Sequence, residues 1–212
     1  MSELDLHEQE QVDALRAWWK ENGKWVLGVV VVGLLGFAGM QFWKSHQAGQ
    51  AAEAAKLYVE VLKQAATNDA KRIGDAADAL AGRYGSSAYA PRAQLLAAQA
   101  SLQAKDIPHA KAQLWWVIEH AKETGLQDTA RLKLASVLLD EKKYDEALKQ
   151  LDAAHPESFT GLYADLKGDV LSAMGKVAEA RVAYQQALDK TDAKSMYRNL
   201  IQLKLDGLGA AK

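Results

Sequence analysis

The feature that most constrains this chain is an apolar run, residues 25–43, that begins and ends with tryptophan. It contains 19 residues and no charged side chain, and Lys24 and Lys44 lie directly outside it. At a rise of about 1.5 Å per residue, a helix of this length spans the hydrocarbon core of a bilayer, which is roughly 30 Å thick. Tryptophan and lysine at both ends suit the interface between lipid and water. The run therefore predicts one transmembrane helix.

A secretory signal peptide also places an apolar stretch near the N-terminus. Its apolar part is usually about 7 to 15 residues long and precedes a cleavage site made of small residues. Here the run is longer, and Met40, Phe42 and Trp43 are bulky where cleavage would need small side chains. A helix buried in a soluble core would need large apolar partners on all sides, which the polar remainder of the chain does not offer. We therefore expect an uncleaved membrane anchor.

The distribution of positive charge around the anchor favours one orientation. Arg16, Lys20 and Lys24 lie within nine residues before the run, whereas the twelve residues after it contain Lys44 alone. Flanking segments rich in Lys and Arg tend to stay in the cytoplasm. The bias predicts a cytoplasmic head, residues 1–24, and a tail on the outer side of the membrane. The lack of cysteine agrees with an oxidising compartment such as a bacterial periplasm. The alternative is a membrane-anchored scaffold with its repeats in the cytoplasm.

The composition of the tail predicts an all-α fold. From residue 44 onward the chain is rich in Ala, Leu, Lys and Gln, with three prolines and no alternating β-branched runs. The whole chain has 26 basic and 27 acidic residues and a formal net charge of −1. That balance excludes the concentrated positive field that a nucleic-acid-binding protein needs.

No motif points to catalysis, a cofactor or a metal ion. No two of the five histidines stand four residues apart, the spacing that places two imidazoles on one helical face. The chain has no cysteine, glycine-rich phosphate loop or nucleophile elbow. We therefore expect a protein without enzymatic activity or cofactor. The histidines are His7, His46, His109, His120 and His155.

An internal repeat predicts the architecture of the tail. Helix pairs recur in which a small residue opens the second helix, at Ala110, Ala147 and Ala180. The intervals of 37 and 33 residues bracket the roughly 34 residues of a tetratricopeptide repeat, and the pattern resembles that family. A small residue where two helices cross lets their backbones approach. We predict three repeats over residues 91–190, none with an aromatic residue near the start of its first helix.

Both ends of such an array need caps, because a terminal repeat otherwise exposes a core face. Residues 44–90 are predicted to form a membrane-proximal helical hairpin, and residues 191–212 a C-terminal capping helix and tail. The expected fold is one N-terminal transmembrane helix followed by a tetratricopeptide-like solenoid of helical hairpins with capping helices.

The inner face formed by the first helices of successive repeats is our candidate protein-binding groove, because helical repeat arrays bind partners on such concave surfaces. Several leucines there would make the groove apolar. Alternatively, the closing helix or the upstream hairpin fills it. The predicted groove residues are Arg92, Leu95, Gln99, Leu102, Thr129, Leu132, Ser136, Leu139, Leu162, Asp165 and Asp169.

Two adjacent tryptophans, Trp115 and Trp116, are candidate surface anchors. Neighbours on a helix point about 100° apart, so both do not easily face one core. Either one packs while the other covers an adjacent helix, or one of them contacts a partner.

Four glycines in the anchor, Gly28, Gly33, Gly36 and Gly39, fall within less than half of the helix circumference. Glycine allows membrane helices to approach closely, so this face is a candidate packing surface for a partner span. Glycine is also frequent in membrane helices in general, which is the competing explanation.

The head completes the pattern. Val12, Leu15 and Trp19 share one helical face, and Asn22 and Gly23 break the periodicity, which predicts a short amphipathic helix at the interface. The acidic head ending in WWKENGK, the glycine-rich span and the repeat tail together resemble the YfgM family, ancillary subunits of the SecYEG translocon of bacteria. The resemblance covers essentially the whole chain.

This resemblance implies partners that hydropathy and repeat spacing do not reach. It implies a periplasmic tail that works with the chaperone PpiD and helps to pass translocating polypeptides to periplasmic chaperones. It also implies a cytoplasmic head that acts on a response regulator of envelope stress. Without the resemblance, the residues predict only a protein-binding module that contacts lipid through residues 25–43.

Overall fold

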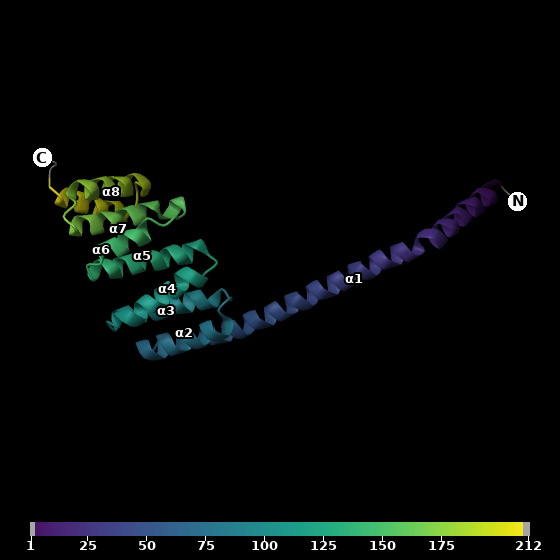
Figure 1. The fold of residues 1–212 in the computed structure, drawn as a ribbon, viewed down its shortest axis with the longest axis horizontal. Helices are drawn as coiled ribbons and strands as arrows, with labels where there is room; N and C mark the ends of the chain where they lie inside the picture. The colour runs from purple at the N-terminus through teal and green to yellow at the C-terminus, as the bar shows by residue number, and fades with distance from the viewer. Residues whose placement is uncertain (1–2, 210–212) are drawn as a thin grey trace. The chain divides into compact units, whose positions relative to one another are not determined.

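The computed structural model describes residues 3–209, with side chains from residue 10 onward, and every regular element within that range is helical (Figure 1). The expected all-α fold is confirmed. The chain divides into two compact units, Met1–Gln50 and Ala51–Lys212. The first helix, α1 (Glu3–Ala65), contributes residues to both units.

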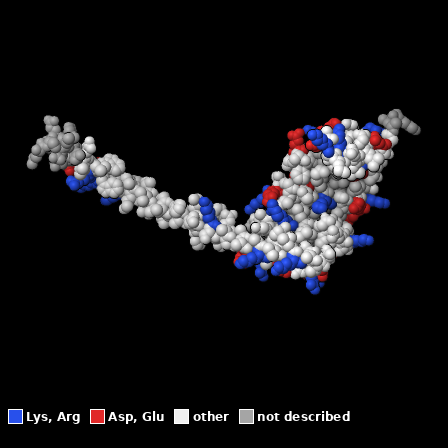
Figure 2. Space-filling view, turned by 180° about the vertical axis from the view of Figure 1, so that it is seen from behind, with Lys and Arg blue, Asp and Glu red and all other residues white. Residues whose placement is uncertain are grey.

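One helix in the described part of the chain, α1, is long and apolar enough to cross a membrane. Its large apolar side chains are exposed, with Trp25 at 80% and Phe42 at 77%, as a segment in contact with lipid requires. Figure 2 shows this stretch of the helix free of charged side chains.

The predicted break before the anchor is wrong, because α1 continues without interruption through Asn22 and Gly23. The side-chain nitrogen of Asn22 donates to the carbonyl of Trp18 at 3.1 Å, so the asparagine bonds within its own helix. The indole of Trp19 covers Gly23, where an added Cβ would lie 3.2 Å from the ring. Local side-chain contacts therefore offset the low helix propensity of this pair.

The second unit consists of helical hairpins stacked in chain order (Figure 1). The end of α1 shares an apolar cluster with α2 and α3, in which Ala54 and Val61 are fully buried. A short 3₁₀ helix, η1 (Glu157–Phe159), precedes α7, and α9 (Met196–Gly207) packs against α8 at the end of the series. The remaining helices are α2 (Ala70–Tyr84), α3 (Tyr89–Gln103), α4 (Ile107–His120), α5 (Thr124–Asp140), α6 (Tyr144–Leu151), α7 (Thr160–Ala173) and α8 (Val177–Lys190).

The same turn joins the two helices of each hairpin. One residue in each turn has a left-handed backbone: Asn68 (φ 55°), Lys105 (φ 60°), Lys142 (φ 59°) and Gly175 (φ 77°). The residues are separated by 37, 37 and 33 positions. The hairpin of α1 and α2 therefore shares its turn geometry and its spacing with the three hairpins that follow.

Helix crossings in the three predicted repeats depend on small residues. Ala110, Ala147 and Ala180 are each 0% exposed, at the starts of α4, α6 and α8. In the last hairpin, a Cβ added to Gly168 would lie only 2.5 Å from the ring of Tyr184. The small residues of the repeat pattern thus allow close packing between paired helices.

The third repeat does have an aromatic residue near the start of its first helix, and the prediction that none does is wrong. Tyr163 is in the first turns of α7 and is 2% exposed. Its hydroxyl donates to Asp128 of α5 at 2.8 Å, and its ring stacks on His155 with centroids 4.0 Å apart. Tyr163 therefore ties α5 to α7 across the turn that contains Pro156.

Candidate protein-binding surface

An opening between the first helices of neighbouring hairpins lies between α3 and α5. This central hollow has a volume of about 470 Å³. Leu102, Ile107 and Val137 give it an apolar floor, and charged side chains stand around them. Such a mixture suits a short apolar stretch of a protein segment with polar groups along its edge. The complete lining is Leu102, Ile107, Lys133, Ser136, Val137, Asp140 and Glu141.

A second opening, the proximal hollow, lies between the end of α1 and α3 and has a volume of about 370 Å³. Lys133 of the central hollow donates to Gln99 of the proximal hollow at 3.0 Å. This one hydrogen bond connects the linings of the two hollows across α3. The proximal lining is Ala65, Asn68, Ile73, Leu96, Gln99, Ala100, Gln103 and Ala104.

The structure places three of the predicted groove residues, Gln99, Leu102 and Ser136, in these hollows. Sequence reasoning missed Lys133, Val137 and Asp140, because it assigned the inward face of α5 one residue too early. The signal was present as polar residues at 129, 133, 136 and 140, which share one face at helical spacing.

Four other predicted groove residues of α3 and α5 have local partners. Leu95, Leu132 and Leu139 are partly buried against the main apolar cluster of the repeat unit. Thr129 donates through its hydroxyl to the carbonyl of Gly125 at 2.7 Å. These side chains support the walls of the array.

Arg92 and Leu162 lie near the starts of their helices. The guanidinium of Arg92 forms an ion pair with Glu123 at 2.8 Å, and so links α3 to the residue before α5. Leu162 is 40% exposed in the first turn of α7. Neither residue lines one of the two hollows.

Asp165 and Asp169 lie under the closing helix rather than on an open surface. Lys204 of α9 donates to both carboxylates at 2.8 Å, and Tyr197 donates to Asp165 at 2.5 Å. Tyr184 of α8 donates to Asp169 at 2.7 Å. Of these, Asp165 is 3% exposed, so this end of the predicted groove is occupied by α9. We call these five residues the capping cluster.

The charges of the capping cluster depend on each other. Burial by itself would lower the pKa of Lys204, but the hydrogen bonds and negative charges of Asp165 and Asp169 raise it above its ordinary value. Burial raises the pKa of Tyr184 and of Tyr197, and the neighbouring carboxylates raise both further. Lysine therefore stays charged and both tyrosines stay neutral, so each carboxylate receives one charged and one neutral donor, while Oδ1 of Asp165 is buried without a partner among the described residues.

The two adjacent tryptophans have different environments. Trp116 packs between two apolar clusters and stacks on His120, with ring centroids 4.4 Å apart. Trp115 is 42% exposed and lines a small hollow of about 280 Å³ between α4 and α6, together with Lys111 and Lys149. Trp115 is thus the tryptophan that a partner can reach.

The glycine face of the anchor is open in the described structure. No atom lies within 4 Å of a Cβ added to Gly28, Gly33, Gly36 or Gly39. The face has room for another helix.

Comparison with known proteins establishes the family. Residues 16–210 match the tetratricopeptide repeat-like domain. An ancillary SecYEG translocon subunit of Neisseria gonorrhoeae is 34% identical over 204 residues, which cover 96% of this chain and 98% of that protein. The chain belongs to this family. Proteins of the same name from Escherichia coli and Haemophilus influenzae are 29% and 26% identical, over 97% and 96% of this chain and 98% of each relative.

No solved structure matches this member of the YfgM family. The agreement with its relatives extends across the anchor and the repeats. The resemblance found in the sequence is therefore confirmed for the chain as a whole.

Proposed function

We propose that this protein is a membrane-anchored module of the SecYEG translocon whose central and proximal hollows bind an extended segment of a translocating polypeptide. The observation that carries the proposal is the pair of hollows on successive first helices, joined by the hydrogen bond from Lys133 to Gln99. The relatives are named as ancillary subunits of that translocon, which supports the site of action.

The wider proposal concerns orientation and partners. The positive charge before the anchor supports a cytoplasmic head and a periplasmic repeat unit. In that arrangement the repeat unit receives newly translocated chains and passes them on with PpiD to periplasmic chaperones. The head then modulates an envelope stress response through a response regulator. No step of this proposal requires catalysis.

In-cell crosslinking tests the hollows. A photoreactive amino acid at Ser136 stands in the central hollow, and one at Gln186 stands on α8, exposed and outside both hollows. We expect translocating polypeptides to be captured from position 136 and not from 186. Equal capture from both positions, or capture of PpiD without any translocating chain at 136, would contradict the proposed occupant.

Reporter fusions test the orientation. Alkaline phosphatase is active in the periplasm, whereas β-galactosidase is active in the cytoplasm. We expect activity from alkaline phosphatase fused after the last residue. Activity from β-galactosidase alone would instead support the scaffold with cytoplasmic repeats.

The glycine face provides a separate test of translocon association. We propose that it packs against a partner span. Replacing Gly28, Gly33, Gly36 and Gly39 by leucine fills the open space beside the helix, so we expect weaker co-purification with the translocon. Leucine replacements at Val30 and Val31, which are exposed and lie outside the arc of the four glycines, serve as the control. Unchanged recovery of the complex after the glycine replacements would remove the glycine face from the proposal.

A further inference from the structure

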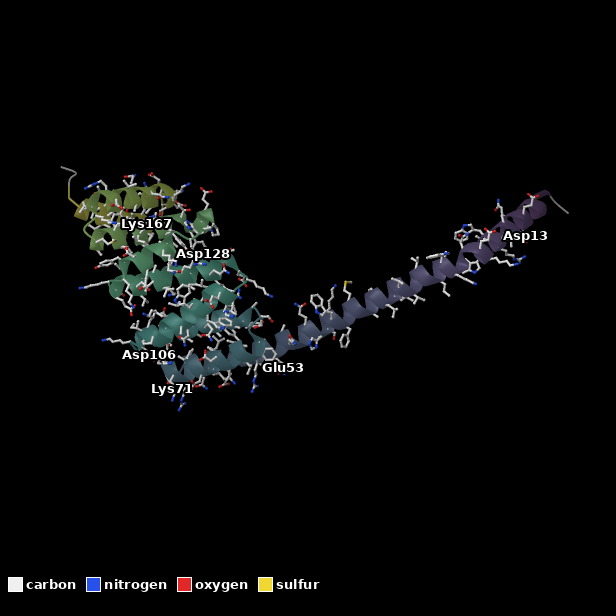
Figure 3. All side chains as sticks on the ribbon, in the orientation of Figure 1. Asp13, Glu53, Lys71, Asp106, Asp128 and Lys167 are labelled. Carbon is white, nitrogen blue, oxygen red and sulfur yellow. The ribbon has the colours of Figure 1, made fainter. Side chains whose placement is uncertain are left out.

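Another opening, the acidic hollow, lies where the starts of α2 and α4 meet the end of α3. Its volume is about 590 Å³, which exceeds that of either the central or the proximal hollow. Figure 3 shows Lys71 and Asp106, which both line it, at the same end of the repeat unit.

Negative charge dominates the lining. Four aspartates face one lysine and one histidine, so the excess is negative in either protonation state of the histidine. Three aspartates have local roles: Asp69 accepts from the first turn of α2, Asp78 accepts from the buried amide of Gln94 at 2.7 Å, and Asp106 bonds to His109 at 2.8 Å. Asp75 has no hydrogen bond or ion pair with any described residue. The ligand that this charge favours is a cation.

The inner wall holds a buried amide with a free donor. Gln113 is 7% exposed, and its side-chain oxygen accepts from the hydroxyl of Ser101 at 3.0 Å. Its side-chain nitrogen lines the hollow and has no acceptor among residues 3–209. Gly74 leaves this nitrogen accessible, because a Cβ there would lie 3.3 Å from it. An N–H group that opens into a hollow without a protein acceptor favours a ligand that brings one.

The charges do not converge as a metal site does. The described residues contain no group of three or more His, Asp or Glu that could hold a metal ion. The ligand must therefore carry a positive group on an extended chain, together with a carbonyl oxygen close enough to accept from Gln113. A lysine or arginine residue in a protein segment has both, since its side chain carries the charge and its backbone carries the acceptor.

The position of the acidic hollow indicates how a segment reaches it. Asn68 and Ala104 line both the acidic hollow and the proximal hollow. A segment that lies with apolar residues in the proximal hollow therefore continues past the turn at Asn68 toward the aspartates. This choice of ligand rests on the proposed function, because it takes a protein segment as the occupant of the neighbouring hollow.

We propose that the acidic hollow recognises a basic residue that follows an apolar stretch of a bound protein segment. The charged group of that residue lies between Asp75 and Asp78, and its backbone carbonyl accepts from Gln113. Arginine suits the pair of carboxylates better than lysine, since a guanidinium presents several donors in one plane.

Peptide binding to the full chain in detergent tests this recognition. One fluorescent peptide carries an apolar stretch followed by two arginines, and a matched peptide carries glutamines in their place. We expect the double replacement of Asp75 and Asp78 by asparagine to weaken binding of the arginine peptide about tenfold, the size of one charge-assisted hydrogen bond. Binding of the glutamine peptide should not change.

Two further variants keep the test decisive. Asp75→Asn alone changes an exposed residue without an internal partner, so it should fold normally and weaken binding about threefold. Asp145→Asn removes an exposed carboxylate of α6, outside the acidic hollow, and should leave both affinities unchanged. Equal losses from the replacements at 75 and 145 would mean unspecific attraction and would overturn the proposal.

The same experiment separates the two proposals. If the glutamine peptide does not bind while binding of the arginine peptide depends on Asp75, the proposal for the acidic hollow is supported and the proposal for the central and proximal hollows is contradicted. If the glutamine peptide binds as tightly as the arginine peptide, the proposal for the central and proximal hollows is supported and the proposal for the acidic hollow is contradicted. Competition by free arginine amide at the affinity of the whole peptide would also overturn the proposal, because the site would then take a small cation.

Discussion

Between α3 and α5 the first helices of neighbouring hairpins leave a hollow, whereas over α7 the closing helix α9 takes the corresponding place. The difference arises from the side chains that these helices present. α3 and α5 present Leu102, Ser136 and Asp140, and the two polar side chains are exposed to solvent, so they need no fixed partner. α7 presents Asp165 and Asp169, which need donors and receive them from Lys204 and Tyr197. One repeated scaffold thus leaves one region accessible and closes another.

Removing the cation of the capping cluster should have the largest effect. Lys204→Met leaves Asp165 and Asp169 without their charged donor in a partly buried site, so we expect a loss of about 3 kcal/mol in the free energy of unfolding. Denaturant unfolding measures it. Lys167→Met breaks an exposed pair with Asp152 and should cost less than about 1 kcal/mol. Equal losses would show that the capping cluster is no stronger than a surface ion pair.

A replacement at the helix crossing of the last hairpin should give the second-largest loss of stability. Gly168→Ala places a Cβ against the ring of Tyr184, so α7 and α8 must separate, at a cost of about 2 kcal/mol. Gly82→Ala in α2 meets no atom within 4 Å and should stabilise the protein by about 0.5 to 1 kcal/mol. Thermal unfolding distinguishes the two. Stabilisation by both replacements would contradict the close crossing.

The hydroxyl of Tyr197 should give a smaller, pH-dependent effect. Tyr197→Phe removes a donor to Asp165 and should cost about 1 kcal/mol at neutral pH. The folded protein raises the pKa of Tyr197 above the ordinary value of 10.0, so this contribution is complete below pH 10 and declines as pH rises further. The difference between the two proteins, measured by urea unfolding, should therefore shrink above pH 10. A constant difference would mean that Tyr197 does not titrate with unfolding.

Replacements in the left-handed turns should change the free energy of unfolding least. Lys142 has φ 59°, which glycine adopts more readily than lysine, so Lys142→Gly should stabilise the protein by less than about 1 kcal/mol. Lys143→Gly at the next position, where φ is −87°, should not stabilise it. If both replacements destabilise equally, the left-handed turn is not a source of strain.

Much of the fold follows from local sequence patterns. The apolar run of the anchor and the alanines at 110, 147 and 180 predict a membrane helix and a series of hairpins, because both depend on spacing along one chain. The break at Asn22 and Gly23 does not occur, because side-chain contacts within α1 outweigh the intrinsic propensities.

The candidate site was predictable only in part. Leu102 and Ser136 were found because the repeat spacing brings them to facing helices. Lys133 was missed because a rotation of α5 by one residue, about 100°, changes which side chains face α3. The acidic hollow was missed because Asp75, Asp106 and Gln113 belong to two helices and only the packing of the hairpins brings them together.

The sequence by itself determined that this chain has one membrane-spanning candidate helix, an all-α repeat unit and membership of the YfgM family. Hydropathy and periodicity are local properties, so they are readable without a structure. Only the tertiary structure decided which part of the array is open. Whether an aspartate on a first helix faces solvent or Lys204 depends on where a helix some 35 residues later packs, and no local pattern records that contact.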